Sequence, residues 1–355
     1  MPGVTGRTVK QAFALLGLNS WGVAASVTKG VYFLGDAGIV HQPDIIEDQA
    51  FGQDFIGQTE RGNTQAVETT LQGQSRYDDH LYLWEASLMG SPAAVTIATS
   101  ASGQTTSWQH IYDLAPDTSG RGVTFAEDLG LYVKEMTSAK VIGVVEEIAA
   151  GGSHSDISFT LLGNDATNTS SVNINSTVYG ANFPVLNNRL QKKQGTFRMN
   201  VQSGGSLVAA DAIRNIDGIR MEFTRPQDRS HELGSATLII PESNAFPTAQ
   251  ISVMFARCTT VSANSIRAAL PAGTVLKADW TFLGNYINST DQYTKKYQFP
   301  HLEVVSLDDT VTGADQVKPK VTLRLFKPTA APTGMAGVVQ PYRLTRIMTN
   351  SLVAF

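Results

Sequence analysis

The chain has 355 residues, of which 42% are apolar and only 16% charged, so it can form one large domain or two medium ones. The single cysteine, Cys258, excludes an intrachain disulfide framework and any multi-cysteine zinc or iron–sulfur site. No run approaches about 18 apolar residues, and the first 20 residues lack the apolar core of a signal peptide. We therefore expect a protein made in a reducing cytoplasm that does not cross a membrane.

Charge is divided unevenly along the chain, whose formal net charge is −4. Residues 1–150 carry 8 Lys/Arg and 17 Asp/Glu, a net of −9, while residues 151–355 carry 19 and 14, a net of +5. Neither part is basic enough to predict a nucleic-acid-binding surface. The asymmetry is expected if the acidic part of one copy meets the basic part of another, although independent drift of the two parts explains it equally well.

Most predicted elements are β-strands, because apolar and polar residues alternate with a period of two. Clusters rich in glycine and proline separate them and predict turns. In chain order the predicted strands are 64–72, 139–148, 156–163, 196–202, 218–224, 275–284 and 318–328.

One clear helix is predicted at 77–89, where apolar residues from Tyr77 to Leu88 recur at i, i+4, i+7 and i+11. Ser75 can cap its start. A second segment, 247–258, has apolar positions that fit either a short helix or a strand.

The two parts of the chain show a faint duplication. In each, a strand precedes a helix or helix candidate, and "FTLLGN" at 159–164 is echoed by "WTFLGN" at 280–285. The two echoes have different offsets, so a duplication requires an insertion, for which the Ser/Thr/Gly-rich span 91–134 is the candidate. Chance similarity is the alternative.

A search for catalytic patterns finds none. The chain has no phosphate-binding G-x-x-x-x-G-K-[ST] loop, no G-x-G-x-x-G before a helix, no G-x-S-x-G elbow and no H-E-x-x-H motif. Its six histidines are scattered, and Glu146 and Glu147 are neighbours on a predicted strand, so they face opposite sides and cannot act as a pair. We expect no catalytic, cofactor or metal site, and hence a structural protein rather than an enzyme.

Four segments resemble the tail tube proteins of long non-contractile-tailed (siphovirus-type) bacteriophages. They are "GLNSWGVAASVTKGVYF" (17–33), "PDIIEDQAFGQDF" (43–55), "GNTQAVETTLQGQSRYDDHLYLWEASLMG" (62–90) and "NIDGIRMEFTRPQD" (215–228). The resemblance covers about residues 20–260, and the family offers no catalytic motif to carry over.

The resemblance implies a mainly β fold, in which each tube domain is a β-sandwich or barrel flanked by one helix. It also implies rings of six such domains, closed by an intersubunit β-barrel around a channel and stacked into a tube for genome ejection. Two tandem domains per chain would give a trimeric, pseudo-hexameric ring, and one domain would give a hexamer. The implied partners are other copies of the chain, the tape measure protein and transiting DNA in the lumen, the tail terminator, and distal tail or baseplate proteins.

With two tandem domains, the expected boundaries are an N-terminal arm at 1–28, a first domain at 29–180, a second at 181–327 and a C-terminal arm at 328–355. The arms combine flexible stretches with apolar anchors and are expected to order on a partner. The predicted contacts between subunits or rings are Trp21, Tyr342, Ile347, Leu352 and Phe355.

We expect the protein in the tail of the virion, after assembly in the host cytoplasm. Within the structural class, a distal ring or a head–tail connector is the alternative. In a different class, the alternative is a β-rich carbohydrate-binding or hydrolytic virion protein, which requires acidic and aromatic residues gathered in one cleft.

Overall fold

The structure is a computed structural model of the chain. It describes residues 9–16, 21–32, 38–39, 45–47, 59–61, 67–79, 93–97, 106–114, 121–184, 188–213, 215–229, 233, 241, 246–256, 272–308 and 318–349.

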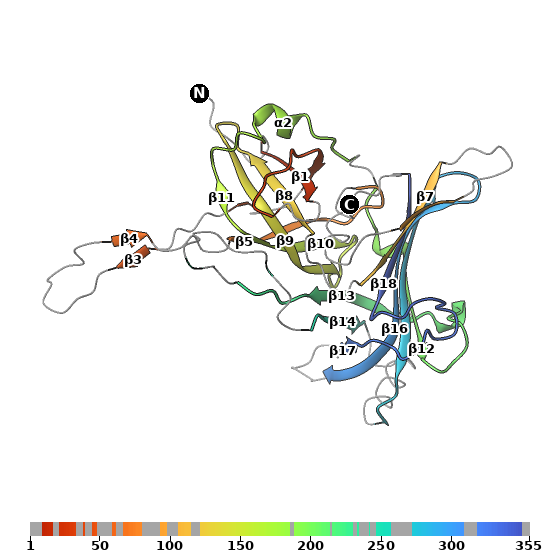
Figure 1. Ribbon diagram of the computed structural model, residues 1–355. Helices are drawn as coiled ribbons and strands as arrows, with labels where there is room; N and C mark the ends of the chain where they lie inside the picture. The colour runs from red at the N-terminus through yellow and green to blue at the C-terminus, as the bar shows by residue number, and fades with distance from the viewer. Residues whose placement is uncertain are drawn as a thin grey trace, which may run out of the picture.

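The protein is mainly β, as predicted, and its strands form one 16-stranded antiparallel sheet and one separate two-stranded sheet (Figure 1). Strands of the first part are β1 (Lys10–Leu16), β2 (Lys29–Val31), β3 (Ile45–Glu47), β4 (Thr59–Arg61), β5 (Val67–Gln74), β6 (Ala93–Ile97), β7 (Ser107–Asp113), β8 (Gly122–Asp128), β9 (Val133–Ile148), β10 (Asp156–Gly163) and β11 (Ala166–Thr167). Those of the second part are β12 (Gly195–Val201), β13 (Ile216–Thr224), β14 (Thr248–Phe255), β15 (Leu276–Tyr286), β16 (Gln292–Asp308), β17 (Lys320–Leu325) and β18 (Arg343–Met348). The described helices are short: α2 (Asn175–Tyr179), η1 (Lys192–Gln194) and η2 (Ala209–Asp211).

The ambiguous segment 247–258 contains a strand, β14. Its side chains alternate between buried and exposed, and it pairs with β13 on one edge and β17 on the other. Pairing on both edges satisfies its backbone and decides between the two periodicities. Of the predicted helix at 77–89, residues 77–79 form a bend, and residues 80–89 lie outside the described residues.

Five strands in the first part have counterparts in the second, in the same spatial order and the same chain order. Across the sheet, the first set runs β1-β8-β9-β10-β5 and the second runs β12-β15-β16-β17-β14. Each set is built around one long strand, β9 with 16 residues or β16 with 17. We call these sets repeat 1 and repeat 2.

The irregularities of the sheet recur with the strands. Both long strands carry a register shift against the preceding strand and another against the following strand, and β16 has a third, between Leu283↔Thr294 and Tyr286↔Gln292. In repeat 1 the shifts lie between the pairs Val123↔Ala139 and Phe125↔Met136, and between Leu161↔Val141 and Thr160↔Gly143. In repeat 2 they lie between Leu276↔Leu302 and Ala278↔Phe299, and between Leu323↔Val304 and Thr322↔Ser306. Because β-bulges are specific local features, their recurrence shows that the repeats share more than strand order.

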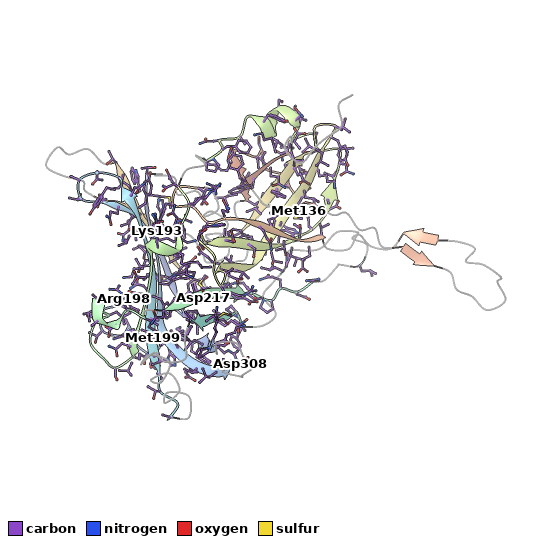
Figure 2. All side chains as sticks on the ribbon, turned by 180° about the vertical axis from the view of Figure 1, so that it is seen from behind. Met136, Lys193, Arg198, Met199, Asp217 and Asp308 are labelled. Carbon is purple, nitrogen blue, oxygen red and sulfur yellow. The ribbon has the colours of Figure 1, made fainter. Side chains whose placement is uncertain are left out.

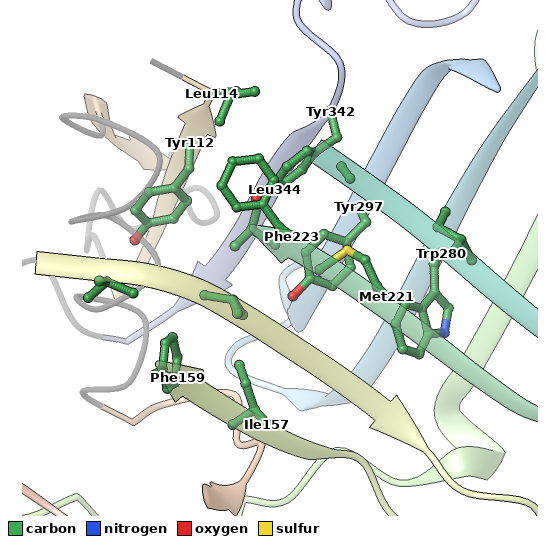
Figure 3. Close-up of a cluster of buried hydrophobic side chains, with 14 of the residues drawn as sticks. Tyr112, Leu114, Ile157, Phe159, Met221, Phe223, Trp280, Tyr297, Tyr342 and Leu344 are labelled. Carbon is green, nitrogen blue, oxygen red and sulfur yellow. The ribbon is translucent and has the colours of Figure 1, made fainter. Parts of the chain in front are cut away.

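The two repeats share one sheet and one core. β9 of repeat 1 pairs with β13, which in turn pairs with β14 of repeat 2. Figure 3 shows the core, where Phe159 of β10 lies near side chains from the second part. Phe223 and Tyr342 stack edge to face at 5.5 Å between ring centroids, and Trp280 stacks on Tyr297 at 5.8 Å.

The start of the described chain belongs to the sheet, which corrects the expected N-terminal arm at 1–28. β1 lies between β2 and β8, and every residue of β8 is buried because both of its faces are covered. On one face, a small cluster joins Ala12 of β1 and Ala126 of β8 to Val178 of α2.

Residues after β1 are also held by their own chain. Backbone amides of Gly22, Ala25 and Val27 donate to Ser138 Oγ at 2.9 Å, Thr124 Oγ1 at 3.0 Å and Asn173 Oδ1 at 2.8 Å. The side chains of repeat 1 and of the loop before α2 therefore anchor this segment.

Two further expectations are corrected by strand pairing. The span 91–134 is not an insertion outside the repeats, because it contains β8, the counterpart of β15, and also β7, which pairs with β18. The predicted C-terminal arm at 328–355 contributes β18, which lies between β16 and β7. The alternating buried residues of β18 are Leu344, Arg346 and Met348, so its inner face is apolar except for a buried arginine.

Candidate assembly surface

One polar face runs across seven consecutive strands of the sheet, in the order β5-β10-β9-β13-β14-β17-β16. Residues that pair across these strands form two rows, and no member of either row is buried. One row is Gln72, Ser158, Val145, Glu222, Gln250, Arg324 and Glu303, and the other is Gln74, Asp156, Glu147, Arg220, Ser252, Thr322 and Ser306. We call this surface the polar face.

The polar face is self-paired and slightly acidic. Its two rows hold four carboxylates and two arginines, and Val145 is their only apolar member. Arg220 contacts Glu147 at 3.0 Å and Glu222 at 3.4 Å, and Gln250 donates to Glu222 at 3.3 Å. Such a surface has few unpaired cationic groups, so it should bind a polyanion weakly.

Two strand edges border the polar face. Among the described strands, β5 pairs only with β10. On β16, β15 covers one edge as far as Leu302, and β17 covers the opposite edge from Leu302 to Asp308. No described strand therefore pairs with the β15-side edge of β16 beyond Leu302. An unpaired edge is a template for pairing with another chain.

Behind this face lies a buried polar network. Glu146 of β9 and Lys295 of β16 are completely buried and form an ion pair at 2.8 Å. Ser155 Oγ donates to Glu146 at 2.9 Å, the hydroxyl of Tyr297 also donates to Glu146, and Lys295 donates to Ser75 Oγ at 3.2 Å. The network thus joins the two long strands, one from each repeat.

The network shifts the protonation equilibria of its members. Burial by itself raises the pKa of Glu146, but the charge of Lys295 and hydrogen bonds from its neighbours outweigh burial and leave that pKa lowered. Burial, and then the negative charge of Glu146, raise the pKa of Tyr77. Glu146 is therefore a carboxylate and Tyr77 a neutral phenol at neutral pH.

This network has no signature in the sequence. Glu146 and Glu147 do face opposite sides, as predicted, since Glu146 is buried and Glu147 lies on the polar face. The basic doublet at 295–296 likewise splits between the two faces: Lys295 enters the network, while Lys296 lies 3.7 Å from Asp279. Period-two alternation predicts such a split, but it does not predict which partner each charge finds.

The predicted contact residues lie in different environments. Trp21 is half-buried at the start of a segment that its own chain holds. Tyr342 is 2% exposed and packs in the core, so it cannot anchor a neighbouring subunit. Ile347 is half-buried in β18, opposite Thr294 and Gln109. Leu352 and Phe355 lie outside the described residues.

Comparison with known proteins gives partial structural matches only. A chain in the virion of a native gene transfer agent particle is 13% identical, and the match covers 38% of this chain and 91% of that one, with a TM-score of 0.24. A chain in the tail of an empty gene transfer agent particle with C6 symmetry is 12% identical with the same coverages and a TM-score of 0.26. No family model and no curated protein matches the sequence. The chain is thus similar, over part of its length, to components of a virion and its tail, and TM-scores of this size do not establish a common fold.

The described part of the chain has no cluster of metal-ligating side chains and no membrane-spanning helix. Its His, Cys, Asp and Glu side chains nowhere gather in a group of three that could hold a metal ion. None of its helices has the length and apolar character needed to span a bilayer.

Proposed function

We propose that this protein is the tail tube subunit of a phage-like particle, and that three copies close each ring into a pseudo-hexamer. The observation that carries the proposal is the tandem repeat, which joins two equivalent units through a continuous sheet with one polar face. Three such chains supply six units. Stacking the rings would then make a channel for the genome, lined by the polar face.

Within the chain, the two repeats are joined where β13 pairs with the edge of β9. We infer that neighbouring chains are joined by an equivalent pairing at the corresponding edge of β16. On β9, β8 covers one edge up to Ala139, and β13 then covers the same edge from Gly143 to Ile148. On β16, Ser306 corresponds to Gly143, because both stand at the same recurring register shift. The edge of β16 from Ser306 to Asp308 is therefore the counterpart of the edge that β13 covers.

A neighbouring chain can supply the missing strand. β13 precedes β14 in repeat 2, so its counterpart would come from the chain before β5 in repeat 1. Docking that part of the next copy against β16 repeats the internal contact and closes the ring. A head-to-tail interface of this kind gives a closed ring when its rotation closes.

A slightly acidic, self-paired wall also suits the proposed function, because DNA must pass without binding. Sequence-independent DNA binding draws its affinity from Lys and Arg at the phosphates, whereas Arg220 on this face is engaged by two carboxylates. The further partners in this proposal are the tape measure protein inside the tube and the terminator and distal tail proteins at its ends. We propose no catalytic activity.

Electron microscopy of the purified protein tests the proposal. We expect annuli or tubes with a central hole, three-fold averages along the axis, and a ring mass of three chains. Rings of six chains would refute the pseudo-hexamer, and a protein that stays monomeric under all conditions would refute the tube.

A lysine on the β15-side edge of β16 at Ser306 should prevent ring closure. Lysine on edge strands disfavours edge-to-edge pairing, so the substitution Ser306→Lys should reduce the assembled fraction at least tenfold while leaving the monomer folded. The matched control is Gln250→Lys, which places the same charge on the polar face at β14, a strand paired on both edges. Sedimentation measures assembly, and equal assembly of both variants would contradict the assignment of the edge.

A further inference from the structure

A basic pocket of about 580 Å³ lies at the turn between β9 and β10, where the polar face ends. Its basic lining residues are His154, Arg189, Lys192 and Lys193, and the other described lining residues are glycine, serine and glutamine. The described lining thus has no carboxylate and no large apolar side chain. A hollow lined by charges of one sign concentrates ions of the other sign, so this pocket favours an anion.

The segment that carries these cations is fixed by backbone hydrogen bonds on both sides. The amide of Ser155 donates to the oxygen of Leu190 at 3.0 Å, and the amide of Leu190 donates to the oxygen of Ser75 at 2.9 Å. Leu190 is completely buried, and its neighbour Arg189 is exposed, as expected where successive side chains of an extended segment point to opposite sides. Lys192 then begins η1. The basic side chains therefore project from a backbone that the sheet holds in place.

Two of the three Lys and Arg side chains in the pocket have no counter-ion. Lys192 contacts the carboxylate of Asp217 at 3.5 Å and donates to the backbone oxygen of the same residue at 2.5 Å. Arg189 and Lys193 are exposed, and their side chains make no hydrogen bond or ion pair with another described residue. Lys193 lies above Asp217 in the view of Figure 2.

The positive charges of this region repel one another. Burial lowers the pKa of Arg76, and the charge of Arg189 lowers it further, against the opposing effect of Asp79. An anion bound by Arg189 and Lys193 would reduce this repulsion and would give both side chains the partner that the described chain does not supply.

We propose that this pocket binds a phosphate group. Arginine presents a planar fork that matches phosphate oxygens, and lysine adds a point charge. A phosphate monoester carries about 1.5 to 2 negative charges at pH 7 and three acceptor oxygens, so Arg189 and Lys193 can bind it together, whereas a carboxylate has one charge and two oxygens. The volume of the pocket lies in the range of small-molecule sites, about 300–1,000 Å³.

The phosphate group has two possible sources, a small phosphate compound or the backbone of a nucleic acid. The pocket lies beyond the two rows of the polar face, since His154 precedes Asp156 of the second row by two residues. The assignment goes beyond the proposed tail function and does not rest on it.

Calorimetric titration of the purified full-length protein with inorganic pyrophosphate tests the proposal. We expect saturable binding with one site per chain at low ionic strength. Arg189→Ala/Lys193→Ala should weaken this binding at least tenfold, because a hydrogen bond to a charged group contributes a factor of about ten or more. The matched control is Arg324→Ala/Lys327→Ala, which removes the same two kinds of exposed charge outside the pocket and should keep the native affinity.

Competition experiments identify the source of the phosphate. A short single-stranded oligonucleotide should displace pyrophosphate if the pocket accepts a nucleic-acid backbone, and failure to displace it would assign the pocket to a small phosphate compound. Succinate should compete at least tenfold less well than either. The proposal is overturned if the native protein shows no saturable binding of pyrophosphate, if succinate competes equally, or if the two double variants lose the same affinity.

Discussion

Replacing Lys295 by methionine should lower the free energy of unfolding by about 3–5 kcal/mol, because it leaves Glu146 as an unpaired charge in the core. Both side chains have no exposed surface, and their ion pair is 2.8 Å long. Tyr297 and Ser155 still donate to the carboxylate in this variant, but neither supplies a positive charge. Urea unfolding followed by circular dichroism measures the loss.

A double variant separates the loss of pairing from the loss of packing. In Glu146→Gln/Lys295→Met the charge is removed. Tyr297 and Ser155 donate to different oxygens of the carboxylate, so the glutamine oxygen accepts from one hydroxyl and its NH2 group can donate to the other. We expect this variant to recover at least 2 kcal/mol of the loss, since paired buried charges are often replaceable by neutral groups. If both variants were equally destabilised, the cost would come from packing around Lys295 and not from an orphaned charge.

The same network predicts a pH dependence. The pKa of Glu146 is lowered in the folded protein, so the unfolded chain takes up its proton first as pH falls. The stabilisation is therefore complete above the ordinary glutamate pKa of about 4.5 and is lost as pH falls through the lower, folded value. Between pH 5 and 3 the free energy of unfolding should fall more steeply in the native protein than in Glu146→Gln/Lys295→Met. Parallel curves would show that other carboxylates control acid unfolding.

Alternation of apolar and polar residues predicts the strands that have one buried face, but it does not predict a strand that is buried on both faces. β5 alternates strictly between buried and exposed residues, and the pattern predicted it. β8 has no exposed residue, so it shows no alternation, and its Ser/Thr/Gly-rich surroundings predict an insertion instead of a strand. In β16, Pro300 lies at a register shift, where a proline is tolerated because the ladder is already interrupted.

The two similar hexapeptides in the sequence do not mark equivalent strands of the two repeats. "FTLLGN" lies on β10 and "WTFLGN" on β15, but the counterpart of β10 is β17, and that of β15 is β8. What recurs is strand order and the position of bulges, which many sequences can encode. The candidate assembly surface was equally hidden, because its free edge at Ser306 is defined by the absence of a neighbouring described strand and not by a motif.

Replacing Asn173 by alanine is the second change with a large expected effect. It should lower the free energy of unfolding by about 3–5 kcal/mol. Asn173 is completely buried, and its amide makes three hydrogen bonds: it accepts from the Val27 amide at 2.8 Å and donates to the Ala25 oxygen at 3.0 Å and to Glu135 at 2.6 Å. Each buried group left without its partner costs about 1–3 kcal/mol. Ser170 still donates to Glu135, so that carboxylate is only partly deprived.

Loss of these bonds should first free the segment that begins at Trp21. Gly22 and Ala25 remain bonded to Ser138 and Thr124, but those bonds lie in half-buried surroundings and are each worth only about 1 kcal/mol. We therefore expect amide exchange around Val27 to accelerate at least 100-fold in Asn173→Ala, with little change in β16. Ser171→Ala is the matched control, because Ser171 is exposed two residues away. Unchanged exchange at Val27 would mean that the segment is held by its pairing with β1 and repeat 1 rather than by Asn173. Trp21 would then be held by the sheet, and this segment would be a fixed part of the folded chain even without the asparagine.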